Sequence, residues 1–421
     1  MKINFENASF KDFENVSGQG LYATVDDFHD YLHFLKGNGH LNYRIESVSP
    51  VGPEMDLLLP GDTKPTRSVC LVSNDYLGFS QHPKIKAAVI DGISRFGTGS
   101  GASPAIGGHF VYHKMLEEKI AAFYQKKEAI LYTTGYTANS ATLQCLLHKE
   151  DLIILDMAVH ASVYEGALNT NVKTFLHNNL DMLEQVLKNA QDKYRTKMVV
   201  IDGVYSQDGD IAPIKEIAEL THKYGGYLVV DDAHGIGVLG KTGRGVIELD
   251  NTFDKVDIIT GTFSKALGNI GGYVLGDPNL IEYLKYQSKQ HLFSTTATPA
   301  IFGILRAIEL VDEEPEWRNK LWANINFLKN GLISAGFAVG TTASAVIPVK
   351  IGDIPKTLEA GRLLLKEGIY TNPIMYPAVS KKNARIRMNV MATHTFEQLG
   401  RVLEAFSGID KKLMIANQQV A

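Results

Sequence analysis

The 421-residue chain contains only two cysteines, Cys70 and Cys145, and both stand in apolar surroundings. Two such residues predict reduced packing side chains and neither a disulfide nor a zinc site. The thirteen histidines lack metal-ligand spacing, so we expect no metal. No stretch is long and apolar enough to span a bilayer, and residues 1–6 lack a signal-peptide pattern, which predicts a cytoplasmic protein. The formal net charge of −4 gives no basic excess for binding nucleic acid.

The two glycine-rich stretches are weak signals for nucleotide binding. Residues 235–242 formally match the P-loop pattern, but Gly243 and Gly245 interrupt the helix that a P-loop must enter. Residues 97–101 lack the third glycine of the dinucleotide-binding pattern, and they precede a strand-like segment instead of following one. We therefore expect neither a nucleoside triphosphatase nor a nicotinamide-dependent enzyme.

The length and the alternation of apolar patterns predict more than one domain. Residues 1–60 are expected to form an N-terminal arm with one aromatic, acidic helix. Residues 61–298 alternate strand-like and helix-like segments, which is typical of an α/β domain with a parallel sheet. Residues 299–421 begin with a long helical pattern and then mix strands with helices, which predicts a smaller C-terminal domain.

Lys265 lies between an apolar strand-like run and a glycine-rich stretch. Taken alone it could be a solvated surface lysine, but a lysine in a desolvated, phosphate-lined pocket forms Schiff bases with aldehydes such as pyridoxal phosphate. Asp231 ends the apolar run 227–230, and an acid at the carboxyl end of a parallel strand could hold a protonated pyridine nitrogen. His234 could donate to the phenolic oxygen of such a ring, whereas Asp232 is expected to be a structural acid. The gap between Asp231 and Lys265 fits one crossover to the next strand, so both would reach the same sheet edge.

With these residues in place, the chain from about residue 71 to its C-terminus resembles the α-oxoamine synthases, which are pyridoxal-phosphate enzymes of fold type I. The resemblance implies a large domain with a mostly parallel, seven-stranded type of sheet, a smaller α+β C-terminal domain and a homodimer. The motifs that carry it are residues 73–78 (Ser-Asn-Asp-Tyr-Leu-Gly), 97–108, 134–136 (Thr-Gly-Tyr), 156–162, 177–179 (His-Asn-Asn), 208–210 (Asp-Gly-Asp), 231–234 (Asp-Asp-Ala-His), 262–265 (Thr-Phe-Ser-Lys), and Arg387 with 392–395 (Ala-Thr-His-Thr).

The resemblance also implies a role for most of the remaining site residues. Residues 129–132 form a strand-like run, and the segment that follows favours a helix, whose first amides could cradle a phosphate. The expected roles are Gly135, Tyr136 and Thr262 on the cofactor phosphate with Ser264 as a helper, His160 on the face of the ring, Ser206 and His234 on the phenolic oxygen, and Ser294 and Thr295 on the phosphate of the partner subunit.

Arg387 is expected to bind the substrate carboxylate with help from Asn74. Residues 384–389 alternate, so Arg385 and Arg387 share one face of a strand, and only the family motif separates them. A guanidinium can hold a carboxylate through two parallel hydrogen bonds. Arg385 is interpreted as a structural pair-former.

The reaction that the resemblance implies is a decarboxylative condensation. An amino acid (serine, glycine or alanine) would join an acyl thioester, carried by coenzyme A or a carrier protein, to give an aminoketone and carbon dioxide. Residues 73–78 resemble aminooxononanoate and aminolevulinate synthases, whereas residues 177–179, 370–373 and 391–395 resemble bacterial serine palmitoyltransferases. Pro104 replaces an arginine of many relatives, which removes a possible contact to a carboxylate or to the acyl donor.

Three alternative interpretations remain open. An aminotransferase of the same fold would need no acyl thioester. A catalytically silent subunit is disfavoured because Lys265, Asp231, His160 and His234 are all present. A P-loop protein would bind nucleotide and show no visible chromophore.

Overall fold

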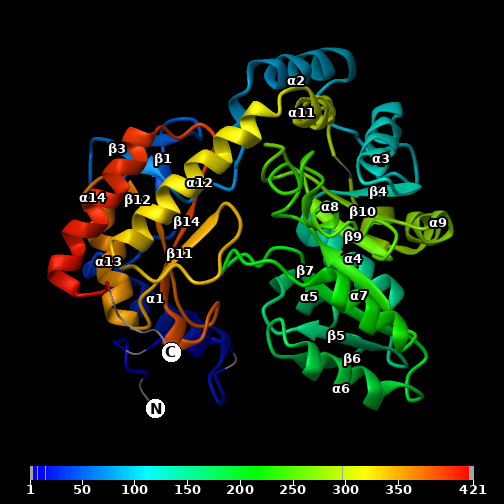
Figure 1. Cartoon of the computed structure of the whole chain (residues 1–421), viewed down its shortest axis with the longest axis horizontal. Helices are drawn as coiled ribbons and strands as arrows, with labels where there is room; N and C mark the ends of the chain where they lie inside the picture. The colour runs from blue at the N-terminus through cyan, green and yellow to red at the C-terminus, as the bar shows by residue number, and fades with distance from the viewer. Residues whose placement is uncertain (1–2, 7, 15, 296, 417–421) are drawn as a thin grey trace. The chain divides into compact units, whose positions relative to one another are not determined.

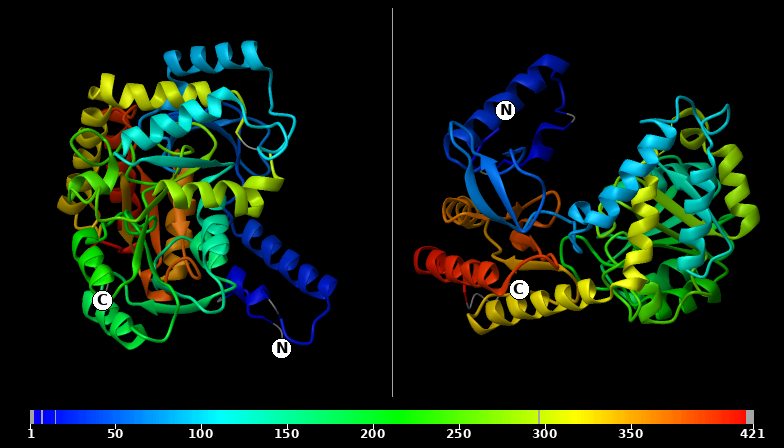
Figure 2. Two further views of the ribbon diagram at one scale, coloured as in Figure 1. Left: turned by 90° about the vertical axis from the view of Figure 1, so that its right-hand side faces the viewer. Right: turned by 90° about the horizontal axis from the view of Figure 1, so that it is seen from above.

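The structure is a computed structural model that describes residues 3–6, 8–14, 16–295 and 297–416. Its contacts divide the chain into two compact units. Unit 1 comprises residues 1–73, 207–209 and 322–421, and unit 2 comprises residues 74–206 and 210–321. The two ends of the chain, blue and red in Figures 1 and 2, therefore belong to the same unit.

Unit 2 is built around a seven-stranded sheet with the order β4-β10-β9-β8-β7-β5-β6. Strands β5 to β9 pair in parallel, whereas β10 runs antiparallel to both of its neighbours, β4 and β9. The sheet is thus mostly parallel, as the sequence predicts. Its strands are β4 (Glu128–Tyr132), β5 (Leu152–Asp156), β6 (Asn171–Phe175), β7 (Lys197–Asp202), β8 (Tyr227–Asp231), β9 (Ile258–Thr262) and β10 (Gly272–Gly276).

Helices pack against this sheet (Figures 1 and 2). Helix α6 shows why they form, because its apolar positions recur at helical spacing and bury Leu183 and Leu187 while its other face stays polar. The helices of the unit are α2 (Pro83–Phe96), α3 (Val111–Phe123), α4 (Gly135–Leu146), α5 (Ala161–Gly166), α6 (Leu180–Ala190), α7 (Ile214–Lys223), α8 (Gly245–Leu249), α9 (Pro278–Gln287), α10 (Lys289–Phe293) and α11 (Ile301–Glu313), with the 3-10 turn η2 (Phe79–Gln81).

The strands at the centre of this sheet are apolar until their last residue, which is an acid. Strands β5, β7 and β8 are buried along almost their whole length and end at Asp156, Asp202 and Asp231. These strands are neighbours and run in parallel, and Asp202 stands opposite Asp231 in the register. Their carboxyl ends therefore gather acids at one edge of the sheet, which is where open α/β sheets bind ligands.

Unit 1 contains two smaller sheets. In the first, with the order β1-β2-β3-β12, β12 near the C-terminus pairs in parallel with β3 near the N-terminus. The second is antiparallel, with the order β11-β14-β13. The elements are η1 (Phe10–Phe13), α1 (Leu21–Gly37), β1 (Glu46–Ser47), β2 (Glu54–Leu58), β3 (Thr66–Cys70), β11 (Val346–Lys350), α13 (Ile354–Lys366), β12 (Ile369–Tyr370), β13 (Asn372–Ile374), η3 (Lys381–Asn383), β14 (Arg385–Asn389) and α14 (Phe396–Leu413), and α12 (Glu316–Ser334) begins in unit 2 and ends in unit 1.

The contact-based division differs from the three parts expected from the sequence. Helix α11 clusters with unit 2 and not with the C-terminal residues, and the N-terminal arm shares a unit with residues 322–421. The pairing of β3 with β12 accounts for the second difference, because it joins segments at opposite ends of the chain. Within the described ranges, no helix combines the length and apolarity needed to cross a membrane.

Candidate active site

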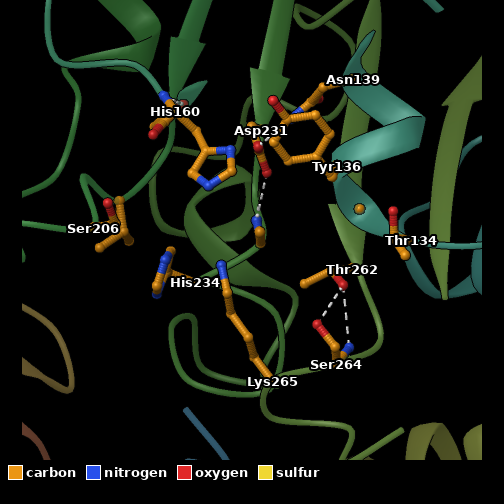
Figure 3. Close-up of a pocket in the computed structure, with 14 residues that line it drawn as sticks. Thr134, Tyr136, Asn139, His160, Ser206, Asp231, His234, Thr262, Ser264 and Lys265 are labelled. Carbon is orange, nitrogen blue, oxygen red and sulfur yellow. Dashed lines mark hydrogen bonds between the residues drawn. The ribbon is translucent and has the colours of Figure 1, made fainter. Parts of the chain in front are cut away.

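A cavity of about 220 Å³ opens at the acidic edge of the seven-stranded sheet in unit 2 (Figure 3). Most of the residues singled out in the sequence line it, although they come from five strand ends and the helices that follow them. The predicted residues that it brings together are Gly135, Tyr136, His160, Ser206, Asp231, His234, Thr262, Ser264 and Lys265.

Lys265 and Asp231 enter the cavity from neighbouring strands. Lys265 follows β9, and Figure 3 shows its side chain extending into the space that His160 and Asp231 face. Asp231 is only 7% exposed, and each carboxylate oxygen has a donor: Ala233 N at 3.0 Å from Oδ1 and Asn139 Nδ2 at 2.6 Å from Oδ2. These two donors hold the carboxylate in one orientation at the base of the cavity.

His160 caps the N-terminus of α5, directly after β5. Its ring is reached by solvent through the cavity, but the surrounding protein desolvates it and lowers its pKa. The Lys265 cation lowers this pKa further, and Asp231 acts in the opposite direction. The ring is therefore neutral near pH 7. It also lies edge-on to the ring of Tyr136, with 5.9 Å between the centroids.

Asp202 is a third buried carboxyl group at this edge. Burial raises its pKa well above the usual range, and the nearby charge of Asp231 raises it further. Its Oδ1 accepts a hydrogen bond from the backbone amide of His160 at 3.3 Å. Asp202 therefore holds the turn that carries His160.

The opposite side of the cavity has the donors expected of a phosphate site. Helix α4 begins at Gly135, and the amides of its first turn have no acceptor within the helix. The Thr262 Oγ1 lies 2.9 Å from Gly271 O and 2.8 Å from Ser264 Oγ, so two hydroxyl groups stand together beside the N-terminus of α4. A β-carbon on Gly135 would lie 2.6 Å from the β-carbon of Thr262, so only glycine lets α4 approach β9 this closely.

His234 is held by a residue that the sequence did not single out. The fully buried Tyr76 places its hydroxyl 2.6 Å from His234 Nδ1. Asn139 was missed as well, although it lies one turn after Gly135 on α4 and therefore on the same helix face. Tyr76 lies inside the family motif of residues 73–78, and an aromatic residue in this polar turn could have indicated a role in the site. Asp202 could have been found from its place at the end of an apolar run.

The remaining predicted residues lie outside this cavity. Ser294 and Thr295 line a separate small cavity next to His291, and both are exposed. Asn74 accepts a hydrogen bond from Tyr76 at 3.3 Å. Arg387 is buried in β14 of unit 1, so its expected role in binding the substrate stays a prediction.

Two residues interpreted as structural have structural partners. Arg385 is 2% exposed and pairs with Asp208 at 2.5 Å. Asp232 is buried and accepts from the Tyr124 hydroxyl at 2.8 Å and from Val246 N at 3.3 Å. In the described part of the chain, no group of three or more His, Cys, Asp or Glu side chains is arranged to hold a metal ion.

Comparisons with known proteins agree on one family. Residues 67–406 match the family model described as aminotransferase class I and II. The chain is 41% identical over 366 residues to 8-amino-7-oxononanoate synthase of Alkaliphilus metalliredigens (strain QYMF), covering 86% of this chain and 92% of that protein. It is 42% identical over 394 residues to the protein of the same name from Thermoanaerobacter pseudethanolicus (strain ATCC 33223 / 39E), covering 93% of this chain and 98% of that protein. The chain belongs to the α-oxoamine synthases. A serine palmitoyltransferase from S. paucimobilis, solved with bound PLP, matches this α-oxoamine synthase with a TM-score of 0.88 and 29% identity over 94% of this chain and 100% of that chain.

These findings confirm the resemblance, the fold class and the cofactor that the sequence predicts. The chain is a pyridoxal-phosphate-dependent acyltransferase of fold type I. The cavity itself fits the cofactor, because three kinds of group surround one space. They are a buried carboxylate that accepts two hydrogen bonds, a lysine amine, and a cradle of helix amides and hydroxyls. Pyridoxal phosphate has a basic ring nitrogen, an aldehyde and a phosphate that match these three groups.

Proposed function

We propose that this α-oxoamine synthase joins a small amino acid, alanine in the first place, to an acyl thioester with release of carbon dioxide. The observation that carries the proposal is the single cavity in which Lys265, Asp231 and His160 meet the N-terminus of α4. An aminotransferase could share this cavity, but the two relatives at 41% and 42% identity are named as 8-amino-7-oxononanoate synthases.

The name of these relatives' product supports alanine as the amino acid. The compound carries an amino group on carbon 8 beside a ketone on carbon 7 of a nine-carbon acid. Separating carbons 7 and 8 leaves a two-carbon amine, which is alanine without its carboxyl group, and a seven-carbon acyl group with a carboxylate at its far end.

The residues of the cavity divide the work as follows. Bound pyridoxal phosphate supplies an electron sink for negative charge on the α-carbon of the amino acid. Asp231 would keep a proton on the ring nitrogen, and the first amides of α4, at Gly135 and Tyr136, would bind the phosphate together with Thr262 and Ser264. Ser206 would donate to the phenolic oxygen, and His234, held through its Nδ1 by Tyr76, would lie beside that oxygen. Lys265 Nζ would hold the aldehyde carbon of the cofactor, and the same amine, when free, would take up the α-proton of the amino acid.

The first test is covalent attachment of the cofactor. The purified enzyme should be yellow, and borohydride should fix the cofactor to Lys265. The Lys265→Ala variant should bind cofactor without a reducible linkage, whereas Lys241→Ala, in the glycine-rich stretch that matches the P-loop pattern, should behave like wild type. A borohydride-reducible linkage that persists in Lys265→Ala would remove this residue from the mechanism.

The second test identifies the substrates. Absorbance is followed while glycine, alanine, serine and threonine are titrated, and thiol release is then measured with acyl thioesters that do or do not end in a carboxylate. Alanine should give the largest spectral change and a thiol-releasing reaction. Turnover with a keto acid in the absence of any thioester would favour the aminotransferase instead.

We also propose that the enzyme is a homodimer. Unit 2 exposes apolar side chains that are costly in water, among them Ile106 and Phe293 at 81% and Ile270 at 58% exposure. Ser294 and Thr295 directly follow Phe293, which supports their expected role at the phosphate of the partner subunit. Ultracentrifugation should give twice the chain mass, and a monomer at micromolar concentration would contradict the proposal. Cytoplasmic location and the lack of a nucleic-acid partner stay predictions.

A further inference from the structure

Asn139 is the centre of a buried hydrogen-bond network behind the cavity. It is 3% exposed and contacts three polar side chains. Its Nδ2 lies 2.6 Å from Asp231 Oδ2 and 3.0 Å from Ser162 Oγ, and its Oδ1 lies 2.6 Å from Thr260 Oγ1. Ser162 is fully buried and continues the network to His160, with 2.8 Å between its Oγ and His160 Nδ1.

The direction of each hydrogen bond in this network follows from its partners. If the amide of Asn139 were turned over, its Oδ1 would face Asp231 Oδ2 at 2.6 Å, and two acceptor oxygens would oppose each other. Nδ2 is therefore the donor to Asp231 and to Ser162, and the Thr260 hydroxyl donates to Oδ1. Each buried polar group of Asn139 then has a partner.

The backbone amide and the hydroxyl of Ser162 together determine the tautomer of His160. The Ser162 amide points at His160 Nδ1 from 3.3 Å, and an amide N–H can only donate. Nδ1 must therefore carry a lone pair and not a proton. The Ser162 hydroxyl, whose oxygen accepts from Asn139, donates to the same nitrogen. The proton of the neutral ring then stands on Nε2, and Figure 3 shows this ring directed into the cavity.

We propose that Asn139 and Ser162 are positioning residues that hold Asp231 and lock His160 as the tautomer with its proton on Nε2. His160 then presents a hydrogen-bond donor, and not a lone pair, to whatever fills the cavity. The Asn139 amide also orients the Asp231 carboxylate, which would face the ring nitrogen of the cofactor. One side chain therefore helps to position both Asp231 and His160. The consequence for catalysis rests on the proposed function, whereas the tautomer does not.

The charged and titratable groups around His160 are consistent with a neutral ring in the resting protein. Lys265 and His234 line the same cavity, and Asp202 accepts a hydrogen bond from the His160 backbone amide. Asp231 is connected to the His160 ring by hydrogen bonds through Asn139 and Ser162. Desolvation lowers the pKa of His160, so the tautomer and not a doubly protonated ring is the species that matters at pH 7.

The test uses the full-length protein with ¹⁵N-labelled histidine, first without cofactor. Two-bond ¹H–¹⁵N spectra distinguish a protonated from an unprotonated ring nitrogen, and loss of one signal set in His160→Gln assigns the ring. We expect an unprotonated Nδ1 and a protonated Nε2 in wild type. Ser162→Ala keeps the backbone amide at 3.3 Å from Nδ1 but loses the shorter bond from the hydroxyl at 2.8 Å, so both nitrogens should shift part of the way toward a tautomer mixture. Ser162→Cys should fall between because a thiol is a weaker donor. Ser140→Ala, a buried serine next to Asn139 on α4, should leave the spectrum unchanged.

The second readout is the kinetics of the cofactor-loaded enzyme. Loss of the hydroxyl in Ser162→Ala should lower kcat about tenfold with less than about a threefold change in the KM of the amino acid, as expected for removing one hydrogen bond behind the site. A proton on Nδ1 of wild-type His160, or spectra of Ser162→Ala identical to wild type, would overturn the proposal. Both results come from cofactor-free protein, so they are independent of whether alanine is the substrate.

Discussion

Asp231 is the residue whose replacement should separate cofactor binding from catalysis. In Asp231→Asn the phosphate cradle is intact, so the cofactor should still bind, but an amide cannot keep a proton on the ring nitrogen. Exchange of the amino-acid α-proton should slow about 10²- to 10³-fold, the size seen when one preorganised electrostatic group is lost. Deuterium exchange measured by NMR tests this, with the exposed Asp192→Asn as control. Exchange at the wild-type rate would remove Asp231 from the mechanism.

His177 is a second residue whose chemistry the structure makes testable. Its Nδ1 lies 3.1 Å from Asp156 and its Nε2 lies 2.8 Å from Asp210. Burial alone would lower its pKa, but hydrogen bonds and attraction from the two carboxylates outweigh burial and raise the pKa to about 10. A raised pKa in the folded state means that His177 stabilises the fold fully below its ordinary value of 6.5, and that this stabilisation is lost as the pH rises through about 10.

The matching variant is His177→Gln, which keeps a neutral donor. Wild type should melt several degrees above the variant at pH 6.5, because hydrogen bonds to charged groups contribute roughly 1.5–3 kcal/mol. This difference should shrink at pH 8 and nearly vanish above pH 10. Thermal unfolding at these pH values is the measurement, and a difference that stays constant would show that His177 is not a cation paired with Asp156 and Asp210.

At the residue scale, the sequence predicted the groups that stand at strand ends. Lys265 and Asp231 were found because each ends or follows an apolar run, whereas His160 was found through the family resemblance, and the cavity brings the three together. Tyr76 contacts His234, which lies 158 positions away in the chain. Asn139 contacts Asp231, which lies 92 positions away. A single sequence contains no local signal for contacts of that span.

At the scale of elements, the junction between α4 and β9 shows how backbone geometry makes the phosphate site. Gly135→Ala would put a methyl group 2.6 Å from Thr262 Cβ, so α4 must move away from β9. We expect cofactor affinity to fall about 10- to 100-fold while the fold is retained, because the amides of the first turn lose their positions. Fluorescence titration with pyridoxal phosphate measures this.

Gly400→Ala provides the matched control for that substitution. Gly400 lies inside α14, and a β-carbon there would meet nothing within 4 Å. Alanine in a helix interior is favoured over glycine by roughly 0.5–1 kcal/mol, so this variant should bind cofactor normally and be slightly more stable. Equal affinity in the two variants would mean that the α4 terminus does not hold the phosphate.

Elements with a strong local pattern were also the ones that the sequence predicted. The turn of residues 133–136 after β4 predicts a helix start, and α4 begins at Gly135. The buried runs of β5, β7 and β8 predict parallel strands, and they pair in parallel. Strand β12, with two residues, carries no periodicity, so neither its existence nor its pairing with β3 could be predicted from the chain.

At the scale of the whole molecule, the N-terminal residues contain two separable parts. An aromatic cluster around Phe13, Tyr31 and Leu35 packs against side chains between Ile3 and Leu41, and the stretch also contacts the C-terminal part of the unit through His40 and Glu359. Strands β1 and β2, in contrast, extend the sheet that joins β3 to β12. The core of the first part is therefore built mainly from its own residues, whereas the second part extends a sheet that includes a strand near the C-terminus.

Two truncations should distinguish these parts. Deletion of residues 1–45 should leave the main thermal transition in place, because β1 begins at Glu46. Deletion of residues 1–60 should lower it clearly, because β3 and β12 would remain as a two-stranded pair, which is marginal in water. Hydrogen exchange of the β3 amides should rise only in the longer deletion, and equal melting of the two would contradict this assignment.

The pairing of β3 with β12 also constrains the order in which the chain matures on the ribosome. Cys70 and its sheet partner Tyr370 are about 300 positions apart. At about 5–20 residues per second, β3 is synthesised roughly 15–60 s before the strand that completes its sheet. The seven-stranded sheet needs no residue beyond β10, so it can form during this interval. Until β12 is synthesised, nascent β3 has one unpaired edge, and an unpaired edge is open to pairing with another chain.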